Sequence, residues 1–157
     1  MPAQPPATAL PTQDERIISA LANVTIVLPF WGAIGAIVIW ATQKDKSRYV
    51  AFQSLQAVVY HLVLILAGFL AGVCYLCSLV AFPLMMGLTV STADPSAEFS
   101  PAFMLPMAMP FAILGASLLG WFLFVVYGLV AAAATLQGKD FRYAIIGRRL
   151  EAYLAHP

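Results

Sequence analysis

The stretch LVLILAGFLAGVCYLCSLVAF, residues 62–82, contains no charged side chain. An apolar run of more than about 18 residues without charges is typical of a helix that crosses a membrane. This stretch lies inside a longer tract, from Tyr49 to Gly138, that has no lysine and no arginine. The sequence therefore predicts an integral membrane protein, and the rest of the chain is interpreted outward from this segment.

The composition of the whole chain supports the same class. Hydrophobic residues make up 62% of the chain and charged residues only 10%, whereas about 25% charged residues is usual in soluble domains. The net charge is +1, and the basic residues are too few to form a nucleic-acid-binding face. We expect an all-α integral membrane protein that does not bind nucleic acid.

Three apolar segments are long enough to span the bilayer: residues 17–42, 50–82 and 103–137. Pro29 removes a backbone donor in the first segment and predicts a kink or break there. The sequence thus predicts about three transmembrane helices, or four if residues 17–42 form a hairpin. Residues 83–102 are expected to be an irregular extracytoplasmic loop, residues 1–13 a disordered tail, and residues 14–157 a single polytopic membrane domain.

Charged residues cluster at the predicted boundaries of these spans. Seven of the eight basic residues lie in two clusters: Lys44, Lys46, Arg48, Lys139, Arg142, Arg148 and Arg149. The connection between the second and third spans carries only Asp94 and Glu98. The positive-inside rule places both basic clusters, and the C-terminus, in the cytoplasm of a prokaryotic inner membrane and the acidic loop outside. Three spans would leave the N-terminus outside, whereas a hairpin at residues 17–42 would keep it inside.

Both ends of the membrane domain carry local helix signals. Thr12 followed by Glu15 has the spacing of a capping box, so a helix is expected to begin there. Residues 143–155 alternate apolar and basic positions with helical spacing, which predicts an amphipathic cytoplasmic helix lying on the inner leaflet.

Small residues recur at a spacing that lets membrane helices approach closely. Gly68 with Gly72, and Gly128 with Ala132, have the small-xxx-small pattern. These pairs predict helix packing, either within the chain or with partners. The expected partners are the lipid bilayer and other membrane protein subunits, or further copies of this chain.

Few residues indicate chemistry. Cys74 and Cys77 form a CxxC pair without a second ligand pair and are expected to be inert thiols. His61 is a candidate metal or haem ligand, but packing is the favoured interpretation. The methionines of FMLPMAMPF, residues 103–111, resemble a copper site but are more typical of irregular apolar packing. We find no catalytic constellation and expect a protein that is not an enzyme and has no cofactor.

Three stretches together resemble the Tic20-like membrane family (DUF4870). They are DERIISALANV at 14–24, KDKSRYVAFQSLQA at 44–57 and VVYGLVAAAATLQGKDFRYAIIGRRLEAYL at 125–154. This chain departs from the family pattern at Asn23 and Gln53, where histidine is usual, and at Ala144, where proline is usual. The resemblance implies a small helical membrane protein with inward basic loops, and its plastid relatives belong to a protein-import channel complex.

Two functions follow as hypotheses. The first is a helix-packing accessory or translocon-like component, with a hydrophilic groove lined by Gln53, Gln56, Tyr60 and His61, four possible polar or ligand contacts. The alternative is an accessory subunit of a respiratory or photosynthetic complex that contacts lipid, quinone or pigment. A metal or haem site at His61 or at the methionines is a third hypothesis.

Overall fold

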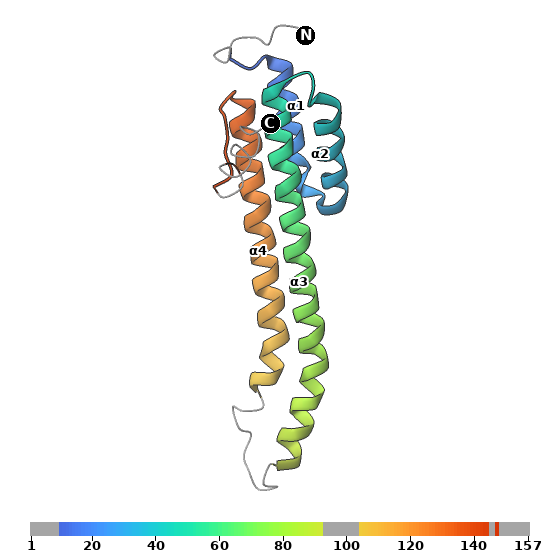
Figure 1. Cartoon of the computed structure of the whole chain (residues 1–157). Coiled ribbons are helices and arrows are strands. Elements are labelled where there is room, and N and C mark those ends of the chain that lie inside the picture. The colour runs from blue at the N-terminus through green and yellow to red at the C-terminus, as the bar shows by residue number, and fades with distance from the viewer. Residues whose placement is uncertain (1–9, 93–103, 145–146, 148–157) are drawn as a thin grey trace. The chain divides into compact units, whose positions relative to one another are not determined.

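A computed structural model describes residues 10–92, 104–144 and 147. The elements in these ranges are helical: α1 (Gln13–Val24), the short 3-10 helix η1 (Thr25–Val27), α2 (Pro29–Gln43), α3 (Arg48–Thr92) and α4 (Met104–Leu136) (Figure 1). The all-α prediction is confirmed for this part of the chain. The amphipathic helix at 143–155 and most of the tail at 1–13 fall outside it.

Two helices, α3 and α4, are long and apolar enough to cross a membrane. Their 45 and 33 residues exceed the roughly 20 residues that a span needs. The predicted segments 50–82 and 103–137 lie almost wholly within them. The described residues therefore contain two candidate spans, where the sequence predicts about three, or four if residues 17–42 form a hairpin.

The segment at 17–42 is not a single span. The capping box at Thr12 starts α1 as expected, with the Thr12 side chain and Glu15 each bonded to the other's backbone N–H. The helix ends at Val24, η1 follows, and α2 begins at Pro29, where the missing N–H is not needed because the first turn has no partner for it. The break expected at Pro29 is confirmed, and it divides the segment into two helices that pack against each other.

Residues 83–92 correct the predicted extracytoplasmic loop at 83–102. Pro83 lies inside α3, which continues as a helix to Thr92. Two further prolines lie in α4: Pro106 falls in its first turn, where its missing N–H has no partner to lose, and the helix continues through Pro110. Proline is tolerated in apolar helices where neighbouring groups satisfy the freed carbonyl, so its presence was a poor guide to the end of a helix here.

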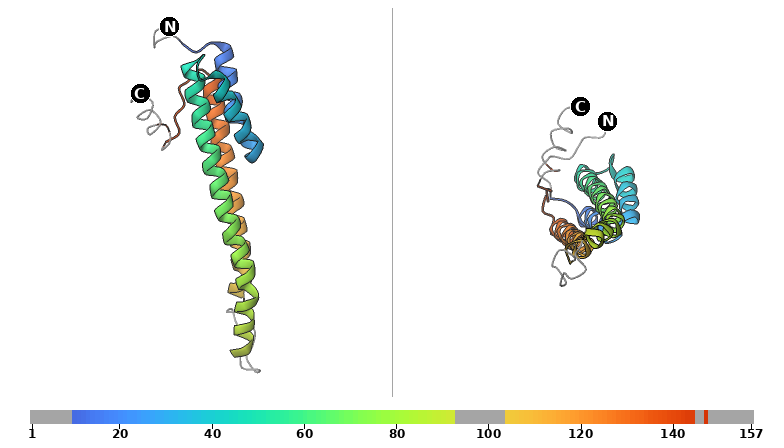
Figure 2. Two further views of the ribbon diagram at one scale, coloured as in Figure 1. Left: turned by 45° about the vertical axis from the view of Figure 1, so that its right-hand side comes forward. Right: turned by 90° about the horizontal axis from the view of Figure 1, so that it is seen from below.

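The described chain divides into two units, and the first contains the packed core. Unit 1 comprises residues up to Ile65 and residues from Phe124 onward. It contains α1, η1, α2, the first part of α3 and the last part of α4. Within it, α1 lies between α2 and the end of α4 (Figure 2). Its core side chains include Ile26, Tyr60, Leu64, Ala131 and Tyr143.

Unit 2 comprises residues 66–123, the remaining parts of α3 and α4. Most of its large apolar side chains are exposed, which suits helices in contact with lipid. It contains an apolar pocket of about 270 Å³, lined by Tyr75, Leu79, Phe82, Met107, Pro110 and Phe111.

The end of α4 reverses the chain direction. Gly138 has a φ of 73°, a left-handed conformation that glycine adopts without strain. Its N–H donates to the Thr135 carbonyl at 2.9 Å, and the Lys139 N–H donates to the Ala134 carbonyl at 3.1 Å. These two bonds form a Schellman motif. They turn residues 139–143 back toward α3.

Candidate functional site

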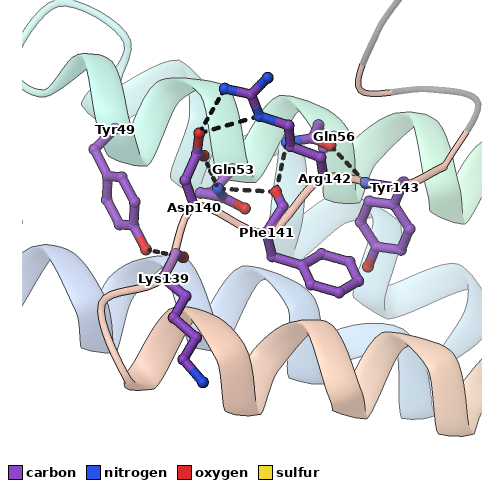
Figure 3. A network of polar contacts seen from close by, with 8 residues as sticks. All are labelled: Tyr49, Gln53, Gln56, Lys139, Asp140, Phe141, Arg142 and Tyr143. Carbon is purple, nitrogen blue, oxygen red and sulfur yellow. Dashed lines mark hydrogen bonds and ion pairs between the residues drawn. The ribbon is translucent and has the colours of Figure 1, made fainter.

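Two buried glutamines of α3 hold the segment that follows α4 (Figure 3). Gln53 Nε2 donates to Asp140 Oδ1 at 3.0 Å and to the Phe141 carbonyl at 3.1 Å. Gln56 Nε2 donates to the same carbonyl at 3.2 Å, and Gln56 Oε1 accepts from the Tyr143 N–H at 3.1 Å. Both side chains are 0% exposed. An amide side chain carries both a donor and an acceptor, so the two glutamines can satisfy the backbone groups of the non-helical segment after α4.

Tyr143 continues this polar cluster to the N-terminal helix. Its hydroxyl donates to Asn23 Oδ1 at 2.9 Å, and Asn23 Nδ2 donates to the Ser19 carbonyl at 2.9 Å. Burial, aided by the nearby Tyr60 and Tyr127, raises the pKa of the Tyr143 phenol. The phenol therefore stays neutral and can donate.

Aromatic rings surround the Tyr143 side chain. The Tyr143 ring stacks on Tyr60 with 4.3 Å between centroids, and Phe141 packs edge-on to Tyr143 at 5.1 Å. Tyr60 also stacks on Phe124, to whose carbonyl its hydroxyl donates at 3.0 Å. Stacked and edge-on pairs contribute about 0.5–1.5 kcal/mol beyond their buried area. The rings therefore fix residues 141–143 against both α3 and α4.

His61 is buried by residues of the N-terminal hairpin. Its Nδ1 lies 2.7 Å from the Ala57 carbonyl and its Nε2 lies 3.5 Å from Thr25 Oγ1. A β-carbon added at Gly32 would lie 2.7 Å from His61 Nε2 and would overlap the Thr25 carbonyl oxygen. Only glycine therefore fits beside this imidazole.

The predicted hydrophilic groove is absent from the described structure. Gln53, Gln56, Tyr60 and His61 are at most 6% exposed, and each makes the hydrogen bonds given above. The four residues lie on one helix, α3, as the sequence predicts. Their amides, hydroxyl and imidazole contact other parts of this chain, which leaves no open polar surface for a passing polypeptide.

The segments that carry the two predicted basic clusters lie beside each other at one end of unit 1. Tyr49 OH, next to Arg48, donates to the Lys139 carbonyl at 3.1 Å. Arg142 forms an exposed ion pair with Asp140 at 3.0 Å. Lys44, Lys46, Arg48, Lys139 and Arg142 are all exposed, whereas Arg148 and Arg149 lie outside the described residues. Their cytoplasmic orientation stays a prediction.

Of the two predicted small-xxx-small pairs, one is packed within the chain and the other is not. Gly128 is buried against Ile26, and a β-carbon there would lie 2.7 Å from Ile26 Cγ2. Ala132, one turn later, is 4% exposed. Gly68 and Gly72, by contrast, have no neighbouring atom within 4 Å of an added β-carbon. Close packing through them remains a prediction about partners of this chain.

The other candidate ligands do not assemble. Cys74 and Cys77 are free and exposed. Met104, Met107 and Met109 are also exposed. Among the residues that the structure describes, no three His, Cys, Asp or Glu side chains are grouped so that they could hold a metal ion.

The comparison with protein families decides what kind of membrane protein this is. The magnetosome magnetite crystal formation protein family, MamF/MmsF, matches residues 14–150, which is most of the chain. The chain belongs to the MamF/MmsF family. No curated protein and no solved structure matches it significantly.

Membership of the MamF/MmsF family refines the earlier resemblance. It is a family of small membrane proteins related in kind to the Tic20-like proteins, so that level of the resemblance is confirmed. The Tic20-like assignment itself stays a prediction. MamF/MmsF proteins are found in the magnetosome membrane, an invagination of a prokaryotic inner membrane, and are not a known enzyme family.

Sequence reasoning missed several residues of the polar cluster. Asn23 and Tyr143 were noted only as parts of the resemblance, and Asp140 was not singled out. One signal was available: Asn23, Gln53 and Ala144 are the places where the chain departs from the Tic20-like pattern. The first two of these belong to the cluster, whereas Ala144 makes none of its hydrogen bonds.

Proposed function

We propose that this MamF/MmsF protein takes part in magnetite crystal formation by presenting the acidic connection between α3 and α4 to the growing mineral. The two spans carry the connection, and the polar cluster holds the helices of unit 1 together. The chain thus acts as a non-enzymatic membrane component.

The distribution of charge carries this proposal. All eight basic residues lie outside the tract from Tyr49 to Gly138, and Asp94 and Glu98 are its only ionisable carboxylates. Two spans return the chain to the side on which it started, so the connection between them lies on the opposite side. If the basic residues are cytoplasmic, as the positive-inside rule favours, the two carboxylates face the lumen of the magnetosome.

Carboxylates suit a surface on which an iron oxide grows. Their oxygens bind hard metal cations, and two of them four residues apart attract cations more strongly than one. The connection contains no lysine or arginine to neutralise them. This gives the lumenal face a local negative potential that concentrates iron cations beside the membrane.

The other hypotheses receive less support. A translocon-like role needs an accessible polar surface at Gln53, Gln56, Tyr60 and His61, and these residues are buried. A subunit role in a respiratory or photosynthetic complex has no specific observation in its favour. Association with partners or with further copies remains compatible with the exposed apolar helices of unit 2.

The experiment replaces both carboxylates by their neutral isosteres. Asp94→Asn with Glu98→Gln is introduced in place of the native chain in magnetosome-forming cells, and crystal size and shape are measured by electron microscopy. The proposal predicts smaller or misshapen crystals at normal amounts of protein. The matched control is Asp45→Asn, an exposed carboxylate in the basic cluster, which should leave the crystals unchanged. Native crystals in cells with normal amounts of the double variant would refute the proposal.

A further inference from the structure

The two ends of the α1–η1–α2 hairpin meet at one end of unit 1. Ser47, just after α2, donates through Oγ to Glu15 Oε1 at 2.6 Å, in the first turn of α1. Gly138, just after α4, lies against the Arg16 guanidinium. The chain therefore enters and leaves the hairpin at the same place, beside the segment that follows α4.

Neither helix of the hairpin is long enough to cross a bilayer. The 12 residues of α1 and the 15 residues of α2 extend about 18 Å and 22 Å at 1.5 Å per residue. The hydrocarbon core is about 30 Å thick. The tip of the hairpin would thus end within the bilayer.

The exposed side chains of the hairpin between Ile17 and Ala41 are all apolar. On α1 the buried positions are small or polar, such as Ser19 and Ala22, whereas Ile17 and Leu21 are about half exposed. This is the reverse of a helix in a soluble protein, whose large apolar side chains face the core. At the tip, Phe30 is 70% exposed and Trp31 75% exposed.

Charged groups are confined to the open end of the hairpin, and the polar side chains between Ile17 and Ala41 are buried or half-buried. No charged residue occurs between Ile17 and Gln43. At the open end, Lys44 Nζ lies 5.7 Å from the centroid of the Trp40 ring. A tryptophan beside a lysine is the combination that anchors helices at the headgroup level.

We propose that the α1–η1–α2 hairpin inserts into a single leaflet, from the side of the basic clusters, with its tip among the lipid acyl chains. The chain then has two full crossings, and the start of α1 lies on the same side as residues 43–48 and 139–143. The occupant of the exposed apolar face is lipid. This inference goes beyond the proposed function, which concerns the opposite side of the membrane.

Labelling of single cysteines tests the topology. The full chain carrying Cys74→Ala and Cys77→Ala is produced in the cytoplasmic membrane of a bacterial host, with Gln13→Cys, Lys46→Cys or Ser96→Cys added singly. A membrane-impermeant maleimide is applied to spheroplasts and to opened membranes. The proposal predicts that positions 13 and 46 react only in opened membranes and position 96 in both.

Two results at position 13 would overturn the proposal. Reaction in intact spheroplasts, together with position 96, would mean that the segment between positions 13 and 46 crosses the membrane once. Failure to react even in opened membranes would mean that the start of α1 is not at the aqueous surface. Neither result depends on crystal formation, so the test stands apart from that of the proposed function.

Fluorescence quenching identifies what covers the apolar face. A variant with Trp40→Phe and Trp121→Phe keeps Trp31 as its single tryptophan and is reconstituted in vesicles containing lipids with a nitroxide deep in the acyl chain. Lipid contact predicts strong quenching of Trp31. Fluorescence equal to that in vesicles without the nitroxide would show that protein covers the tip, and would contradict the lipid assignment.

Discussion

Tyr143 and Asn23, 120 residues apart in sequence, are joined by a buried hydrogen bond of 2.9 Å. Asn23 lies at the end of α1 and Tyr143 lies beyond α4, so this bond connects the N-terminal hairpin to the segment that follows α4. Unpartnered polar groups in a buried site are costly. The bond therefore makes the position of α1 and that of the segment after α4 depend on each other.

The buried phenol of Tyr143 predicts sensitivity to alkali. Because burial raises its pKa in the folded protein, the unfolded state loses this proton first as the pH rises above about 10. The free energy of unfolding should therefore fall above that pH. Tyr143→Phe should weaken this dependence while lowering stability at neutral pH. This pH dependence is measured by following tyrosinate absorbance and helix content as the pH is raised. The same loss of stability above about pH 10 in Tyr143→Phe as in the native chain would contradict the prediction.

Glu15 predicts a dependence at acid pH. The Ser47 hydroxyl and the Thr12 backbone N–H, both donating to this carboxylate, hold its pKa below the usual value of 4.5. Its contribution to stability is present above that value and is lost as the pH falls through the lower, folded pKa. Glu15→Gln should flatten this limb of an acid titration of stability, and Asp14→Asn serves as the control. If stability fell with acid pH in the same way in Glu15→Gln and in the native chain, the hydrogen bonds to the Glu15 carboxylate would not contribute to stability.

Gln56→Leu should release the segment after α4. The change leaves the buried Tyr143 N–H without its acceptor, at a cost of about 1–3 kcal/mol. Hydrogen exchange at the Tyr143 amide should accelerate accordingly. The control is Gln137→Leu, since Gln137 is exposed and its loss should change neither stability nor exchange at residue 143. Native protection of that amide in the Gln56 variant would show that the segment is held by other contacts.

Glycine substitutions should separate packed from open positions. Gly128→Ala places a methyl group against the fully buried Ile26 and should cost about 1–3 kcal/mol. Gly32→Ala should be worse, because the obstacle is the Thr25 backbone. Gly115→Ala, with nothing within 4 Å, should be neutral or stabilising by up to about 1 kcal/mol from helix propensity. Equal stabilities of the Gly128 and Gly115 variants would contradict the described packing.

Much of the fold could be predicted from local sequence signals. The capping box at Thr12, the break at Pro29 and the two long helices all follow from local hydrogen-bonding rules and hydropathy. The extent of α3 could not be predicted in this way, because a proline in an apolar segment does not indicate whether the helix ends there or continues. Pro83 continues it.

The site was predictable only in part, since its contacts join residues far apart in the chain. Gln53 and Gln56 were recognised as polar residues on a membrane helix, but a sequence does not say whether such amides face water or another segment. Their partners are the backbone and side chains of residues 140–143. Those partners follow a Schellman turn at Gly138, and that reversal could not be foreseen from the basic residues around it.

The most direct test of the account is the coupling free energy between Asn23 and Tyr143. Unfolding of the full chain in mixed micelles is measured for the native protein, Asn23→Ala, Tyr143→Phe and the double variant. Direct contact between the two side chains predicts a coupling of about 0.5–3 kcal/mol. Additive effects of the two substitutions, with a coupling near zero, would contradict the claim that one buried polar cluster holds α1 and the segment after α4 together.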